Sequence, residues 1–112
     1  MSLSKTQQEF TVCTAKLILW AHERGWGLTF GEAHRPPELA ALYAEQGRGI
    51  AGSVHGLRLA VDFNLFVGGV FQTTTEAHRP LGEYWETLHP LARWGGRFDD
   101  GNHYSFEQNG RK

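Results

Sequence analysis

Residues 59–66, LAVDFNLF, constrain the fold of this chain more than any other segment. In a β-strand successive side chains point to opposite faces of the sheet. One face of this segment would carry Asp62 and Asn64 beside Ala60, whereas the opposite face would be wholly apolar, with Leu59, Val61, Phe63 and Leu65. The pattern therefore predicts a strand that packs one face on a core and exposes a carboxylate on the other.

The first half of the chain predicts two helices and a short strand. Over residues 5–24, Phe10, Cys13, Leu17 and Trp20 recur at spacings of three and four, which is the apolar stripe of an amphipathic helix. Gly25 follows that stripe as a natural stop. We expect a strand over residues 26–33 and a second helix over about 37–45, opened by two prolines.

The second half predicts a hairpin, a helix and a strand. Gly68 and Gly69 favour a turn between the strand at 59–66 and a short strand at 70–71. A third helix is expected from about 81 to 93, with Pro90 kinking or dividing it. Residues 103–107, HYSFE, alternate again and predict a strand. The fold class is therefore α+β, with helices packed on a small, mostly antiparallel sheet.

Length, charge and cysteine content limit the possible functions. The 112 residues suit one domain over 1–112, and a net charge of -1 gives no electrostatic reason to bind nucleic acid. Cys13 is the single cysteine, so no disulfide can form within the chain, and we expect a buried thiol. Without an apolar signal core or a stretch of 18 apolar residues, we expect cytoplasmic synthesis and no membrane span.

His55 and Asp62 are candidate ligands of one metal ion. Residues seven apart on a helix lie about 10.5 Å apart along its axis, too far to share an ion. Gly56 lets His55 sit on a turn that folds back over the strand carrying Asp62. His103 lies opposite Tyr104 and Phe106 on its own strand, so a neighbouring pair of strands would bring His103 beside Asp62.

Two histidines and a carboxylate form a common catalytic zinc set. Three protein ligands leave a fourth position for water, and the charge of the ion lowers the pKa of that water toward about 7. From spacing alone the alternative stays open, since isolated aspartates in strands usually face solvent and isolated histidines are usually structural. Residue types and spacing therefore allow the metal site without requiring it.

Three segments together resemble one zinc peptidase family. Residues 53–62, SVHGLRLAVD, resemble its S-x-H-x-x-G-x-A-x-D motif, with Arg58 at the usual glycine position. Residues 100–103, DGNH, resemble its D-x-x-H motif, and residues 35–49 resemble its R-T-x-E and L-Y-A-x-G-R segment, with Leu39 where glutamine is common. The family comprises VanY-like D-alanyl-D-alanine carboxypeptidases and phage L-alanyl-D-glutamate endopeptidases, whose zinc fold the hedgehog signalling domain shares. The resemblance covers roughly residues 26–107.

The resemblance implies a role for each matching residue. His55, Asp62 and His103 would hold one Zn²⁺, and Asp100 would be the catalytic base, with Asp99 as its competitor. Arg35 would stabilise the oxyanion formed at the scissile carbonyl. Ser53 is a candidate substrate contact or a simple turn residue. The local charge pattern makes Arg48 and Arg58 candidate contacts for carboxylates of a peptidoglycan stem peptide, although Arg58, at the usual glycine position, could instead clash with the turn.

The function expected from this resemblance is a zinc L-alanyl-D-glutamate endopeptidase that degrades the bacterial cell wall, as phage endolysins do. It would be a monomer that acts on the host wall after release from the cytoplasm. A D-alanyl-D-alanine carboxypeptidase or dipeptidase remains an alternative. So does a non-catalytic zinc-containing binding domain of the same fold. A metal-dependent nuclease is disfavoured by the near-neutral charge.

Overall fold

The computed structural model describes residues 2–47 and 53–112. Its helices are α1 (Leu3–Glu23), α2 (Pro37–Glu45) and α3 (Arg79–Glu86). Its strands are β1 (Gly27–Phe30), β2 (Ala60–Val67), β3 (Val70–Phe71), β4 (Ala92–Trp94) and β5 (His103–Phe106). Short 3₁₀ turns occur at η1 (Val54–Leu57), η2 (Glu76–His78) and η3 (Gly95–Phe98).

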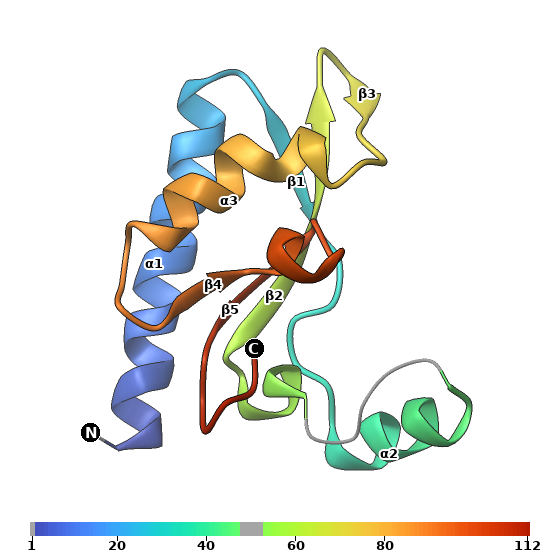
Figure 1. Ribbon diagram of the computed structural model, residues 1–112. Coiled ribbons are helices and arrows are strands. Elements are labelled where there is room, and N and C mark those ends of the chain that lie inside the picture. The colour runs from blue at the N-terminus through green and yellow to red at the C-terminus, as the bar shows by residue number, and fades with distance from the viewer. Residues whose placement is uncertain (1, 48–52) are drawn as a thin grey trace.

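The strands form one antiparallel sheet in the order β1-β2-β5-β4, and β3 adds to β2 as a hairpin (Figure 1). β2 is the central strand: residues 63–66 pair with β1, and residues 60–62 pair with β5 on the other side. In this register Asp62 lies directly opposite His103. The predicted α+β class with a small antiparallel sheet is confirmed.

Helices α1 and α3 pack beside each other against the sheet, and the core lies between the helices and the strands (Figure 1). The stripe of α1 buries Phe10, Cys13 and Leu17 as expected. Burial raises the pKa of the Cys13 thiol, which keeps it protonated at neutral pH. Phe10 meets Trp85 and Phe106 edge-on, with ring centroids 5.5 Å and 5.2 Å away.

The predicted helix over 81–93 is wrong beyond residue 86. Helix α3 ends at Glu86, and residues 92–94 form strand β4 against β5 instead. Pro90 has no backbone N–H and disfavours helical geometry before it, so the helix ends ahead of it. The indole of Trp85 donates to the carbonyl oxygens of Arg93 and Ser105 at 3.0 and 3.1 Å, which ties α3 to the two strands.

None of the helices in the described ranges combines the length and apolar character needed to cross a bilayer.

The apolar face of β2 is buried as predicted, with Val61, Phe63 and Leu65 each at most 2% exposed. Asp62, on the opposite face, is half-buried, and it faces the candidate site.

Candidate metal centre

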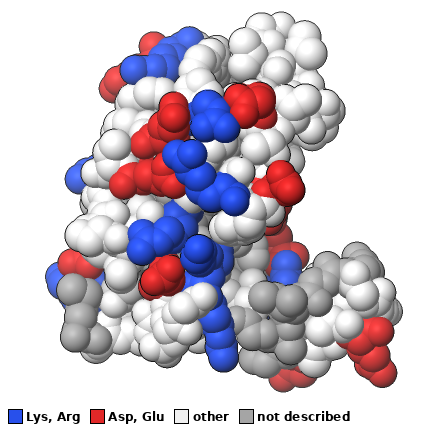
Figure 2. All heavy atoms as spheres, viewed as in Figure 1, with Lys and Arg blue, Asp and Glu red and all other residues white. Residues whose placement is uncertain are grey.

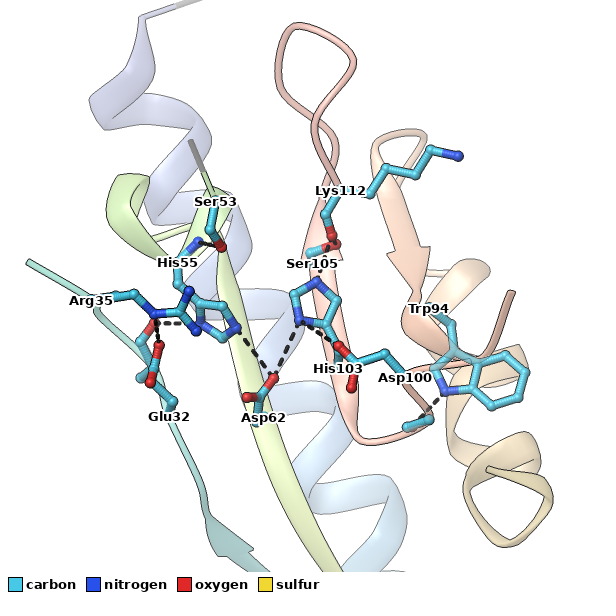
Figure 3. A network of polar contacts seen from close by, with 12 residues as sticks. Glu32, Arg35, Ser53, His55, Asp62, Trp94, Asp100, His103, Ser105 and Lys112 are labelled. Carbon is cyan, nitrogen blue, oxygen red and sulfur yellow. Dashed lines mark hydrogen bonds and ion pairs between the residues drawn. The ribbon is translucent and has the colours of Figure 1, made fainter. Parts of the chain in front are cut away.

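Three side chains that lie far apart in the sequence converge on one point. The Nε2 atom of His55 lies 3.3 Å from Oδ1 of Asp62, and Nδ1 of His103 lies 3.2 Å from the same oxygen (Figure 3). Ligand atoms about 2.0–2.2 Å from a tetrahedral ion lie roughly 3.3–3.6 Å from one another. One ligand atom from each of the three residues lies within 4.8 Å of the others, so the group can hold a metal ion.

Local backbone structure brings His55 over the strand. Ser53 caps the η1 turn, where its hydroxyl accepts from the backbone N–H of His55 at 3.2 Å. The backbone N–H of Arg35 donates to the carbonyl of His55 at 3.2 Å, which ties this turn to the segment after β1. The turn ends at Arg58, whose φ of 57° is left-handed. Glycine adopts this conformation with least strain, so Arg58 occupies a position where glycine would be favoured.

The outer nitrogen of each histidine ring is held by a backbone carbonyl. Nδ1 of His55 donates to the carbonyl oxygen of Ala33 at 2.9 Å, and Nε2 of His103 donates to that of Lys112. Each bond places the proton on the outer nitrogen when the ring is neutral. The inner nitrogens, which face Asp62, then keep their lone pairs for a metal ion. This arrangement fits a bound cation better than a buried ion pair alone.

The three groups shift one another's protonation in the metal-free protein. Burial alone would raise the pKa of Asp62, but hydrogen bonds from His103 and His55 and their charges lower it to about 2. Burial alone would lower the pKa of His55, but the hydrogen bonds to Asp62 and to the Ala33 carbonyl raise it above the usual 6.5.

These shifts predict a pH window for the stability of the metal-free protein. The contribution of Asp62 is complete above its unfolded pKa of 3.8 and is lost as the pH falls toward about 2. The contribution of His55 is complete below 6.5 and is lost as the pH rises through its raised pKa. Thermal melting of chelator-treated protein should therefore show the site stabilising most between these limits, and Asp62→Asn should flatten that profile.

Metal binding should have the opposite pH dependence at the upper end of this range. His55 must lose its proton to bind a cation, so metal affinity should increase as the pH rises through the pKa of His55. Titration with Zn²⁺ at several pH values would measure it. Equal affinity at all pH values around the raised His55 pKa would contradict a role for this ring as a ligand.

Asp100 lies beside the candidate metal ligands, and Asp99 does not. The Oδ2 atom of Asp100 is 3.9 Å from Nδ1 of His103, and Asp100 lines the same cavity as the ligands. Burial raises the pKa of its carboxyl above the ordinary value. Asp99 has a left-handed φ of 61° and lines a neighbouring hollow instead. Position therefore favours Asp100 as the proton acceptor.

The loop that carries Asp100 is held by close packing around Trp94. The indole N–H of Trp94 donates to the carbonyl of Gly101 at 2.8 Å, and the N–H of Asp100 donates to the carbonyl of Gly95 at 2.8 Å. A Cβ atom on Gly95 would lie 2.1 Å from the Asp100 carbonyl oxygen and 2.7 Å from Cβ of His103. The sequence Trp94-Gly95 thus fixes the distance between the base candidate and a metal ligand.

We expect Gly95→Ala to lower the melting temperature by several degrees and to weaken metal binding. The added methyl group must displace the backbone of Asp100 and the side chain of His103, and overpacking of this kind costs about 1–3 kcal/mol. Gly27→Ala is the matched control, since its Cβ would meet Cβ of Phe66 at an ordinary 3.6 Å. Equal melting temperatures for the two variants would show that the loop tolerates displacement.

The ligands and Asp100 border a cavity of about 280 Å³, with Arg35, Phe98, Arg111 and Lys112 among its other lining residues. The side chain of Arg35 is 12% exposed, and its Nε donates to Glu32, which fixes the guanidinium beside His55 (Figure 3). Phe98 meets the ring of His103 edge-on, with 5.8 Å between centroids. The cavity thus places cationic and aromatic side chains around the three candidate metal ligands.

The predicted substrate contacts lie in different places. Ser53 lines the cavity as well as capping the turn. Arg58 lines a separate hollow with Phe10 and Phe30, away from the ligands. Arg48 lies outside the described residues. The structure therefore brings Arg35, Ser53 and Asp100 to the cavity of the candidate metal ligands, and it does not bring Arg58 there.

Sequence reasoning missed Glu32, Arg111 and Lys112. The backbone carbonyl of Glu32 accepts from the N–H of Asp62 at 2.7 Å, so this residue continues the pairing of β1 with β2. Lys112 reaches His103 because a reverse turn pairs Gln108 with Arg111 and returns the chain along β5. The left-handed Asn109-Gly110 pair in that turn was the available signal for it.

The remaining histidines lie away from the cluster. His22 and His34 are exposed, and the ring of His89 binds the carboxylate of Glu9 at 3.0 Å. His78 is buried, with its Nδ1 2.7 Å from the hydroxyl of Tyr104.

Comparison of the chain with models of known protein families gives no match, and comparison with curated protein sequences gives none. The site therefore has to be interpreted from its own geometry and from the motifs in the sequence.

Proposed function

We propose that this protein is a zinc peptidase that hydrolyses peptide bonds in the stem peptides of peptidoglycan, most specifically the L-alanyl-D-glutamate bond. The observation that carries the proposal is the convergence of His55, Asp62 and His103, with Asp100 at 3.9 Å from His103. The sequence motifs that contain these residues resemble those of one peptidase family, in the same order.

Zinc suits the ligand set. Two imidazole nitrogens and one carboxylate oxygen are donors that Zn²⁺ commonly takes in catalytic sites. Zn²⁺ held here would supply a Lewis acid that polarises a carbonyl and makes water a stronger nucleophile at neutral pH. The backbone carbonyls of Ala33 and Lys112 would orient the two histidine rings toward it.

Asp100 would transfer the proton, and Arg35 would stabilise the developing negative charge. Asp100 accepts a proton from the attacking water and returns it to the leaving amine, which requires a carboxylate within one water's reach of the site. Arg35, fixed by Glu32, presents a positive charge to the oxygen that becomes anionic during attack. Both side chains line the same cavity, where Arg35 is largely buried and Asp100 is open to solvent, and this placement supports the division of roles.

The cationic part of the cavity wall supports an acidic substrate. Arg111 and Lys112 are both exposed and line the cavity. A stem peptide carries free carboxylates, including that of D-glutamate, and cationic side chains at a cleft attract such groups. Figure 2 shows Lys and Arg side chains interleaved with Asp and Glu over this view of the surface, so the attraction would be local.

Digestion of purified peptidoglycan sacculi tests the proposal. The zinc-loaded protein should release new amino termini and no new reducing sugar ends, since peptide bonds and not glycosidic bonds are cut. Mass spectrometry of the products should place the cut after L-alanine. Release of terminal D-alanine would support the carboxypeptidase alternative, and bound metal without any product would support a non-catalytic domain.

A further inference from the structure

A second hollow lies directly beside the metal cavity, and Asp100 lines both. Its volume is about 290 Å³. This is near the lower end of the range for small-molecule sites, about 300–1,000 Å³, and suits a single ring rather than an extended chain. Residues 71–75 form one wall of the hollow, and residues 99–102 form the other.

The hollow exists because two strands pair with different parts of one edge of β2. On this edge β5 pairs with residues 60–62 and β3 with residues 66–67, which leaves a gap between them. Loops border the gap on both sides. The backbone N–H of Phe63 donates to the carbonyl oxygen of Asn102 at 2.9 Å, and the backbone N–H of Gln72 donates to that of Leu65 at 2.8 Å. The opening is therefore held by backbone hydrogen bonds on both sides.

The lining is polar and mostly uncharged. Its residues include Thr73, Thr74 and Thr75 with hydroxyl groups, Asn64, Gln72 and Asn102 with amide groups, and Phe71 with an exposed ring. Residues 67–75 contain no charged side chain, and the tip of the β2–β3 hairpin is accordingly white in Figure 2. The only charged lining residues that we identify in the described part of the chain are Asp99 and Asp100, and Asp100 also lines the metal cavity.

His78 adds a buried polar group to this lining. Its side chain is 3% exposed, and its Nδ1 is held by the hydroxyl of Tyr104 at 2.7 Å. Burial lowers the pKa of the ring, so it is neutral at neutral pH. A neutral imidazole held through one nitrogen can exchange a hydrogen bond with a neutral ligand group through the other.

We infer that this hollow binds a sugar ring of the glycan strand to which the hydrolysed peptide is attached. Hydroxyl and amide side chains match the hydroxyl and acetamido groups of an N-acetylated sugar. Phe71, 51% exposed at the edge, offers a flat apolar face against which a sugar ring can pack. The inference rests on the proposed function, because the same Asp100 that borders the hollow would act on the peptide bond.

The two hollows on either side of Asp100 also set the direction of the substrate. The metal cavity has Arg111 and Lys112 in its wall, whereas the second hollow is lined by neutral hydrogen-bonding groups. A stem peptide is neutral at its glycan end and acidic beyond the first residue. The glycan would lie in the second hollow and the D-glutamate carboxylate in the metal cavity. The bond at Asp100 is then the first peptide bond after the sugar, which favours an endopeptidase over a carboxypeptidase.

A matched pair of variants on β3 tests the inference. Phe71 lines the hollow, whereas its neighbour Val70, 63% exposed, is not among the lining residues. With the zinc-loaded protein, Phe71→Ala should lower kcat/KM for a muramyl peptide by about fivefold to tenfold, the worth of one aromatic contact. It should leave kcat/KM for the same peptide without the sugar unchanged. Val70→Ala should change neither value.

A binding measurement separates this inference from the proposed function. Titration of ¹⁵N-labelled protein with N,N′,N″-triacetylchitotriose should shift the amide signals of residues 71–75 and 99–102, and Phe71→Ala should reduce these shifts. If no peptide is cut but the signals shift, the sugar site stands and the peptidase proposal fails. If peptides are cut and no signals shift, or if the two variants behave alike on the muramyl peptide, the sugar site is wrong.

Discussion

Replacement of His103 by alanine is expected to abolish metal binding and hydrolysis while leaving the fold intact. The variant keeps one imidazole and one carboxylate at the site, and metal affinity should fall by more than about 100-fold, beyond the loss typical for a residue that only supports a ligand. The fold should persist because Tyr104 and Phe106, which anchor β5 in the core, remain in place. Metal analysis after gel filtration and circular dichroism would measure both effects.

His89→Ala is the matched control for that experiment. The half-buried ring of His89 contacts the carboxylate of Glu9, accepts from the N–H of Leu91 and stacks on Phe106, so its loss removes an imidazole without touching the three candidate ligands. The control should keep about one zinc per chain. Stoichiometric zinc in His103→Ala, or its loss in His89→Ala, would mean that the metal is bound somewhere other than at Asp62.

The convergence of the three candidate ligands was partly predictable, because each belongs to a local pattern. Alternation in residues 59–66 assigns Asp62 to the face opposite the core, and the same alternation assigns His103 to the equivalent face of its strand. Gly56 after His55 indicates a turn, and a 3₁₀ turn occurs there. The register that sets Asp62 against His103 depends on strand pairing, for which the sequence carries no local mark.

The parts that could not be predicted depend on contacts between distant segments. The helical spacing of residues 81–93 continues past Glu86, yet β4 forms because those residues complete the edge of the sheet beside β5. Lys112 orients His103 through its backbone carbonyl, so its side-chain type gives no indication of that role. Backbone groups are common to all residues, and their functional use appears only in three dimensions.

Replacement of Asp100 by asparagine is expected to separate metal binding from turnover. Metal content should stay unchanged, since Asp100 is not one of the three ligands and its Oδ2 lies 3.9 Å from His103. Asparagine has nearly the same shape but accepts no proton at neutral pH, so hydrolysis should fall by about 100-fold to 10,000-fold, the range for loss of a general base. Rates measured under saturating zinc and substrate would isolate the chemical step.

Asp99→Asn is the control, because Asp99 adjoins Asp100 and carries the same charge but does not line the metal cavity. It removes one negative charge from the loop and keeps the carboxylate beside His103, so hydrolysis should fall by less than about twofold, as for a rim charge. A larger loss of activity in Asp99→Asn than in Asp100→Asn would assign proton transfer to Asp99. The loop after Trp94 would then have to change conformation to bring Asp99 into the metal cavity. Full activity in both variants would leave Arg35 and the metal as the catalytic groups, with water itself accepting the proton.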